Sequence, residues 1–160
     1  MKALVVYSTQ TENTKKLAHA IYESLPGEKE MYFVGDAPDP AGYDVVALGF
    51  WLMAGKPDPK AAAYLEKMKA GQKVFLFATH GAAKGSAHAS QAMQAAREMV
   101  PNAAIVGTYS CQGEVNPNVL AKAKAKPQPP VWLEDAAGAV GHPDEGDLEE
   151  LRNIIAAVSL

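Results

Sequence analysis

Residues 7–14 read Tyr7-Ser8-Thr9-Gln10-Thr11-Glu12-Asn13-Thr14, between the apolar run Ala3–Tyr7 and a helical pattern that begins near Asn13. A loop that joins a buried strand to a helix presents free backbone N–H groups and the positive end of the helix dipole. Four hydroxyls and two amides crowd into this turn, so it suits a phosphate without any cationic side chain. The alternative is an ordinary polar turn that caps the helix, because Ser, Thr and Asn are common caps.

Further apolar runs indicate the strands of one sheet. Val45–Phe50, Val74–Ala78 and Ala104–Tyr109 are rich in apolar residues, as is Ala3–Tyr7, and none alternates with polar residues. Strands that are apolar on both faces are typical of a parallel sheet covered by helices on each side. The shorter and more mixed run Met31–Val34 indicates an edge strand.

Four helical patterns lie between and after these runs. The first ends at Pro26-Gly27, the second begins at Asp58-Pro59, the third covers His88–Val100, and the last follows Asp144. Asp58 is expected as the N-cap of the second helix, and Gly71 as the C′ residue that ends it. The alternation predicts a three-layer α/β/α sandwich with a five-stranded parallel sheet, as a single domain over residues 1–160.

Two segments are less regular. Gly35–Gly42 has room for a short helix, but its Ala-Pro and Asp-Pro steps favour an extended loop, which is what we expect. Asn118–Lys126 is expected to be a short basic helix, which the following prolines end. A long structureless linker inside a compact domain is uncommon, so Trp132 and Leu133 are expected to anchor residues 113–141 to the body of the fold.

Composition excludes several classes of function. No apolar run approaches the ~20 residues that a membrane-spanning helix needs. The net charge of −3 gives no general attraction to nucleic acid or to an anionic membrane. The only cysteine, Cys111, cannot form an internal disulfide and is typical of a reducing cytoplasm. We therefore expect a cytoplasmic monomer. We expect no metal site, because the scattered histidines lack the spacing of metal ligands.

In a doubly wound sheet, a ligand lies beyond the carboxyl ends of the strands, where the strand order reverses. The loops after the first, third, fourth and fifth strands should meet there. They offer a phosphate loop, an aromatic wall at Trp51, and glycines that allow close backbone approach. Together they predict a pocket for a flat heterocycle that carries a phosphate. The candidate residues are Ser8, Thr9, Gln10, Thr11, Glu12, Asn13 and Thr14; Trp51, Leu52, Met53, Ala54 and Gly55; His80, Gly81 and Ala82; and Cys111, Gln112 and Gly113.

The segment Val5–Ala18 resembles the FMN phosphate-binding signature of the flavodoxin family. An apolar pair and Tyr7 precede the hydroxyl-rich loop, Asn13-Thr14 opens the helix, and Ala18 follows four residues later. The resemblance extends over the whole chain, at the length of short-chain flavodoxins. It implies the strand order 2-1-3-4-5, a non-covalent FMN whose phosphate is held by Ser8–Thr14, and low-potential electron transfer between redox partner proteins.

Three positions depart from the family pattern. Glu12 stands where the family usually has glycine, and its carboxylate should repel a phosphate unless it points to solvent or reaches a lysine such as Lys15. The loop after the fourth strand lacks the tyrosine that many flavodoxins place against the flavin. In the loop after the third strand, Trp51 or Met53 would cover the ring, and a carbonyl of Ala54-Gly55 would accept the flavin N5–H.

The same loops argue against other proteins of this topology. A receiver domain needs acidic residues at the ends of the first and third strands, where this chain has Tyr7-Ser8 and Gly49-Phe50. A low-molecular-weight phosphatase needs Cys and Arg in the first loop, and this loop has neither. A nicotinamide-binding domain needs glycines there, and this loop has none. What remains is an electron shuttle without catalytic residues, a small FMN enzyme that reduces a quinone or bilin-like acceptor in a wider pocket, or a flavodoxin-like domain that binds no flavin.

Overall fold

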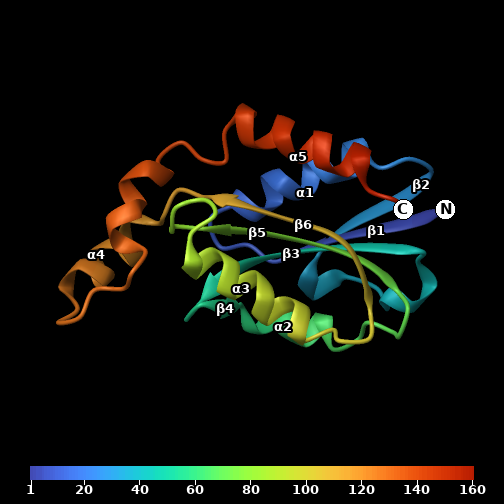
Figure 1. Cartoon of the computed structure of the whole chain (residues 1–160), viewed down its shortest axis with the longest axis horizontal. Coiled ribbons are helices and arrows are strands. Elements are labelled where there is room, and N and C mark those ends of the chain that lie inside the picture. The colour runs from blue at the N-terminus through green and yellow to red at the C-terminus, as the bar shows by residue number, and fades with distance from the viewer.

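A computed structural model describes residues 1–160 (Figure 1). Its parallel strands lie in the order β2-β1-β3-β5-β6, which confirms the predicted order once the short strand β4 is left out of the numbering. β4 pairs antiparallel with the end of β3 and was not predicted, because two residues carry no periodicity. The strands are β1 (Lys2–Tyr7), β2 (Glu28–Phe33), β3 (Val45–Met53), β4 (Lys56–Pro57), β5 (Lys73–His80) and β6 (Ala104–Gln112).

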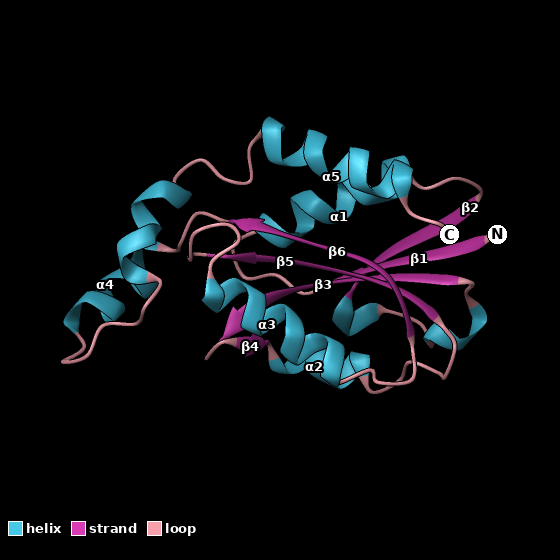
Figure 2. Ribbon diagram, viewed as in Figure 1, coloured by secondary structure: helices cyan, strands magenta, loops and turns pink.

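Helices cover both faces of the sheet, as the sandwich prediction required (Figure 2). On one face α1 (Asn13–Ser24) packs beside α5 (Glu145–Ala157), and α2 (Pro59–Leu65) and α3 (Ala87–Glu98) cover the other. The short helix α4 (Pro117–Ala125) stands apart from both layers, beyond the carboxyl ends of the strands (Figure 1). None of the helices is both long enough and apolar enough to cross a membrane.

Side-chain alternation along the strands divides the core into two halves. In β1, Leu4 and Val6 belong to the half under α2 and α3, whereas Ala3 and Val5 belong to the half under α1 and α5. All four side chains are fully buried, which explains why this run shows no polar alternation. In β3, a Cβ added to Gly49 would lie 2.2 Å from the ring of Phe77 on β5, so this glycine makes room for a buried aromatic.

The segment Gly35–Gly42 is more compact than the predicted extended loop. Two 3₁₀ turns occupy it, Val34–Asp36 and Pro40–Gly42. The carboxylate of Asp39 accepts a hydrogen bond from the backbone N–H of Ala41 at 2.8 Å and so caps the second turn. An Asp-Pro step therefore starts a tight turn here instead of extending the chain.

The start of α2 agrees with the sequence, but its end does not. Asp58 is the N-cap, and its carboxylate accepts a hydrogen bond from the N–H of Ala61. The helix ends at Leu65, well before Gly71, so the predicted C′ position is wrong. Gly71 has a φ of +75° in the turn that leads to β5, where its N–H donates to the carbonyl of Asn102. The positive φ of Gly71 thus belongs to the turn before β5 and not to the end of α2.

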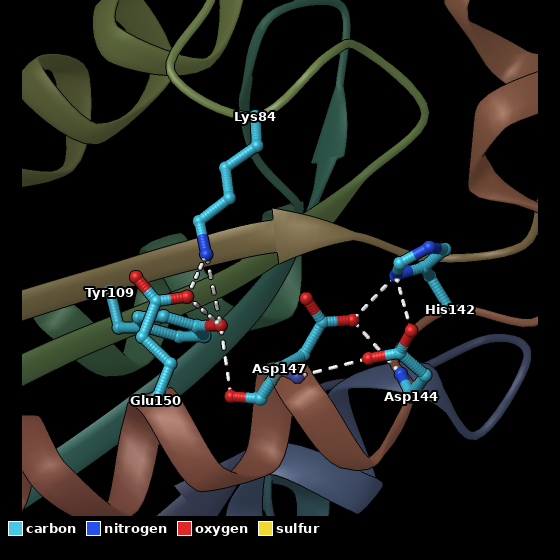
Figure 3. A network of polar contacts seen from close by, with 6 residues as sticks. All are labelled: Lys84, Tyr109, His142, Asp144, Asp147 and Glu150. Carbon is cyan, nitrogen blue, oxygen red and sulfur yellow. Dashed lines mark hydrogen bonds and ion pairs between the residues drawn. The ribbon is translucent and has the colours of Figure 1, made fainter.

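A polar network fixes the N-terminus of α5 (Figure 3). Asp144 and Asp147 form a capping box, in which each carboxylate accepts the backbone N–H of the other residue. The Nδ1 of His142 lies 2.6 Å from the Asp147 carboxylate, and this hydrogen bond raises the pKa of the imidazole. These three side chains could also hold a cation, but the helix cap already accounts for the placement of both carboxylates.

The same network ties α5 to the sheet (Figure 3). The hydroxyl of Tyr109 on β6 donates to the backbone carbonyl of Asp147 at 3.0 Å. The ammonium of Lys84, from the loop after β5, pairs with the carboxylate of Glu150 and lies over the Tyr109 ring. The loop between β5 and α3 is therefore held in place from the side of α5.

Candidate functional site

A cleft of about 260 Å³ opens where the strands end. The chain leaves β1 toward α1 on one face and leaves β3 toward α2 on the other, so this is the crevice that the strand order predicts. All four predicted loops contribute to its lining. The predicted residues that line it are Thr9, Gln10, Thr11, Asn13, Thr14, Trp51, Leu52, Ala54, Gly55, His80, Gly81 and Gly113.

The N-terminus of α1 has no side-chain cap. Glu12 occupies the N-cap position, and neither it nor any other side chain bonds the first N–H groups. Each of the other four α-helices has such a cap, from Asp58, Ser86, Asn116 or Asp144. The ordinary capped turn considered from the sequence is therefore not what this loop forms. Its N–H groups and the positive end of the helix dipole remain available beside the cleft.

Most hydroxyls of the first loop are already hydrogen-bonded within the protein. Thr14 shares a 3.0 Å hydrogen bond with Thr79 on β5, and Thr11 accepts one from the Asn13 amide at 2.8 Å. The Oγ1 of Thr9 differs, since it is buried and has no partner. Leaving a buried hydroxyl unpaired costs about 1–3 kcal/mol. Thr9 is therefore the hydroxyl of this loop that still needs a ligand atom.

Ser8 serves a different purpose. Its hydroxyl donates to the carboxylate of Asp58 at 2.6 Å, in a fully buried contact. Asp58 also accepts the backbone N–H of Trp51 at 3.3 Å, and its own N–H donates to the Trp51 carbonyl at 3.0 Å. This one carboxylate therefore joins the loop after β1 to the loop after β3.

The side chain of Glu12 points away from the loop that it interrupts. Its carboxylate lies 3.4 Å from the ammonium of Lys15 and is 63% exposed. This is one of the two orientations that the sequence left open. The φ of Glu12 is +67°, in the left-handed region that glycine adopts without strain. The left-handed backbone at Glu12 thus gives a physical reason for the glycine that the flavodoxin pattern usually has at this position.

Gly113, which follows β6, packs directly on the first loop. The amide of Asn13 donates to the carbonyl of Glu114 at 2.9 Å, and the N–H of Gly113 donates to the carbonyl of His80 at 2.9 Å. A Cβ added to Gly113 would lie 2.8 Å from the Asn13 amide nitrogen. The close approach that the sequence suggested for this glycine is made to a neighbouring loop of the protein.

His80, the last residue of β5, presents an unusual imidazole. Its Nδ1 lies 2.8 Å from the carbonyl of Ala82, so Nδ1 carries the proton and donates it. Its Nε2 is buried and has no partner. Burial is the main cause that lowers the pKa of His80; the hydrogen bond to the Ala82 carbonyl opposes it, and His88 and Lys84 add smaller effects that lower the pKa further. The ring is therefore neutral at pH 7.

The sequence missed one wall of the cleft. It comes from the segment after β6, from residues that were assigned only an anchoring role or none. The indole of Trp132 lies over Gly81, because a Cβ at Gly81 would be 3.2 Å from its Cε3 atom. The residues of this wall that line the cleft are Glu114, Val115, Asn116, Val119, Pro130, Val131 and Trp132. Thr79 on β5 and His88 on α3 also line the cleft and were not among the predicted residues.

Hydrogen bonds hold this wall against the sheet. The carboxylate of Asp135 accepts the backbone N–H of Ala83 at 3.0 Å. The amide of Gln112 donates both to the carbonyl of Gly81 at 3.2 Å and to that of Asp135 at 3.1 Å. Residues 113–141 are thus anchored to the body of the fold, through Asp135 and the contact of Trp132 with Gly81. As a result, an aromatic side chain reaches the loop after β5, which has none of its own.

Six of the predicted residues do not line the cleft: Ser8, Glu12, Met53, Ala82, Cys111 and Gln112. Met53 is 51% exposed at the tip of the β3–β4 hairpin. Cys111 lies fully buried in the core under α1 and α5, where burial raises the pKa of its thiol to about 12. Ala82 and Gln112 take part only through the hydrogen bonds described above.

Comparison with known proteins agrees with the fold described above. Among solved structures, flavodoxin 2 from Bacillus cereus superposes with a TM-score of 0.67 at 21% identity, over 98% of this chain and 97% of that one. The azoreductase AzrA superposes with a TM-score of 0.60 at 14% identity, over 98% and 99%. At these identities the two structures show a shared fold.

Sequence comparison goes further. The flavodoxin-like domain-containing protein BilS of Clostridioides difficile is 32% identical to this chain, over 94% of the chain and 92% of that protein. The model of the flavodoxin domain family matches residues 4–156. The chain therefore belongs to the flavodoxin domain family.

Proposed function

We propose that the cleft binds FMN, with the phosphate at the N-terminus of α1, and that the protein carries electrons between redox partner proteins. The observation that carries this proposal is the loop before α1. Its helix is the one α-helix without a side-chain cap, and the Thr9 hydroxyl beside it is buried without a partner. A phosphate offers acceptor oxygens to both, and the helix dipole favours its charge.

The rest of the cleft fits the ring of the same cofactor. Trp51 and Trp132 bring two indole side chains to the lining, and Leu52 and Val115 add apolar surface. When bound, FMN supplies low-potential electron transfer at its isoalloxazine ring. Apolar neighbours exclude water from a bound ring and disfavour negative charge on it. These residues would therefore keep the reduction potential low.

Several features favour a carrier over an enzyme. The only thiol, Cys111, lies outside the cleft and is protonated at pH 7. The buried imidazole of His80 is neutral and has no carboxylate partner to form a proton-transfer pair. The cleft thus offers groups that bind and shield a cofactor, and the electron acceptor would be a separate redox protein.

A second candidate function is the reduction of a small planar acceptor, such as a quinone or a bilin-like molecule. The observation in its favour is the extra wall after β6, which adds Val119, Pro130 and Val131 to the cleft. Val131 is 73% exposed and Val119 is 41% exposed, so part of this apolar surface has no cover within the chain. Such a surface would suit an apolar substrate beside the flavin.

Binding is tested first by comparing FMN with riboflavin, which lacks the phosphate. We expect visible flavin absorption after FMN is added to the purified protein and the excess removed, and clearly weaker binding of riboflavin. Thr9→Val, which keeps the shape but removes the hydroxyl, should weaken FMN roughly tenfold and leave riboflavin unchanged. Equal affinities for the two flavins, or no binding of either, would reject the proposal.

The FMN-loaded protein then separates the two functions. A carrier should oxidise NAD(P)H only when a flavodoxin reductase is present and should pass electrons to an acceptor protein. An enzyme should reduce a soluble quinone with NAD(P)H as the only donor. Turnover without a reductase would therefore favour the second candidate.

A further inference from the structure

The imidazole of His80 has a hydrogen-bonding capacity that the protein does not use. Only 6% of the residue is exposed, and it lines the cleft at the end of β5. Because Nδ1–H donates to the Ala82 carbonyl at 2.8 Å, the lone pair of the neutral ring is on Nε2. Nε2 is buried and unpartnered. A buried acceptor without a donor destabilises the fold, which calls for a reason to keep it.

The surroundings of His80 keep this nitrogen an acceptor. Burial opposes a second proton on the ring most strongly, and His88 from α3 and Lys84 from the loop after β5 oppose it as well. The one opposing contact, the Ala82 carbonyl, is already taken by Nδ1–H. Protonation of Nε2 would place a cation in a buried position with no carboxylate to pair with it. His80 therefore presents to the cleft a neutral acceptor of fixed direction.

We propose that Nε2 of His80 accepts a hydrogen bond from a ring N–H of the bound flavin and so determines how the cleft recognises the edge of the ring. The inference rests on the proposed FMN binding. The oxidised isoalloxazine carries a single N–H group, at N3, and this is the donor that matches the vacant acceptor. His80 is then a cofactor-binding residue that selects for an N–H at the ring edge.

Two substitutions separate this role from a structural one. His80→Asn places its amide where Nδ1 lies, so the bond to Ala82 is kept and the acceptor at Nε2 is removed. His80→Gln places its amide near Nε2, where its oxygen can accept. We expect the Asn variant to bind FMN roughly tenfold more weakly and the Gln variant to bind within a few-fold of the wild type. Urea unfolding of the apo-proteins measures what the loss of buried ring atoms costs the fold, separately from the change in flavin affinity.

Flavin methylated at N3 supplies the complementary probe. The wild type and the Gln variant should bind 3-methyl-FMN at least tenfold more weakly than FMN. The Asn variant should bind the two flavins equally. This measurement uses affinity alone and does not depend on electron transfer.

The outcomes are distinct. If the wild type binds 3-methyl-FMN as tightly as FMN, the role of His80 is overturned while FMN binding itself stands. The inference also fails if the Asn variant still discriminates, because the N–H is then recognised elsewhere. If the Asn variant does not fold, the comparison of the two flavins in the wild type and the Gln variant decides. Absence of all flavin binding would remove the proposed function, and this inference with it.

Discussion

Replacing Glu12 with glycine should stabilise the protein relative to replacing it with alanine. Glu12 has a φ of +67° and is one of two non-glycine residues with a positive φ, the other being Ala54. For a residue with a Cβ this conformation is strained, whereas glycine adopts it freely. Both substitutions remove the same carboxylate and the same contact with Lys15, so their difference isolates the backbone.

The magnitude follows from three terms. The left-handed conformation costs a residue with a Cβ roughly 1–2 kcal/mol. Glycine gives back roughly 0.5–1 kcal/mol, because it makes the unfolded chain more flexible. The ion pair with Lys15, at 3.4 Å between exposed groups, is worth about 0.5 kcal/mol and is lost in both variants. Glu12→Gly should therefore be about 1 kcal/mol more stable than Glu12→Ala, and Glu12→Ala slightly less stable than the wild type.

Urea unfolding of the apo-proteins at one pH measures this difference. A change in midpoint with an unchanged slope reports stability alone. FMN titration of the same variants reports the direction of the carboxylate. Because Glu12 pairs with Lys15 and is mostly exposed, both variants should bind FMN within about twofold of the wild type.

Two results would contradict this reasoning. If the alanine variant is as stable as the glycine variant, Glu12 does not hold the left-handed conformation. If both variants bind FMN about tenfold more tightly, the carboxylate faces the phosphate and the orientation toward Lys15 is not maintained.

Three further predictions concern other parts of the fold. Gly113→Ala should weaken FMN binding several-fold and lower the free energy of unfolding by about 1–3 kcal/mol, because the added Cβ would lie 2.8 Å from the Asn13 amide nitrogen. Flavin titration and urea unfolding measure the two effects. No change in either would show that the first loop moves aside easily. Trp132→Ala should weaken FMN binding by up to about tenfold, at the scale of one aromatic contact, whereas unchanged affinity would place the indole outside the flavin site. The pKa of His142 is raised above its ordinary value of 6.5, so its contribution to stability is fully present below that pH and is lost as the pH rises through the raised pKa. His142→Ala should therefore destabilise the protein more at about pH 5.5 than at about pH 9. An equal loss of stability at the two pH values would show that protonation of His142 does not stabilise the fold.

The sequence predicted the sheet well because its strands are buried on both faces. Residues of runs such as Ala3–Tyr7 fill both halves of the core, so their apolar composition identifies the strand. The Asp58 cap was also predictable, since an acceptor followed by proline starts a helix by local chemistry. The end of α2 was not, because Gly71 serves equally well in a turn beyond the helix.

The lining of the candidate site agrees with the sequence where it follows from topology, and differs where it depends on contacts between residues distant in the chain. Parallel strand ends meet at one edge of a sheet, which brought the four expected loops to the cleft. Nothing local reveals that the Ser8 hydroxyl is bonded to Asp58, far along the chain, and so is not free for a ligand. The sequence predicts Trp132 only as an anchor. Its place over Gly81 depends on the segment after β6, which hydrogen bonds of Asp135 and Gln112 hold against the sheet, and no local pattern reveals these bonds.

The carboxylate of Asp58 has a consequence for how the cofactor is recognised. It bonds the hydroxyl of Ser8 and the N–H of Trp51, so the conformations of the loop after β1 and the loop after β3 are coupled. A ligand fragment that orders one loop lowers the entropic cost of ordering the other. Inorganic phosphate should therefore promote the binding of riboflavin, and riboflavin should promote the binding of phosphate by the same factor. Through Asp58, the phosphate and the riboflavin portion of FMN would bind cooperatively.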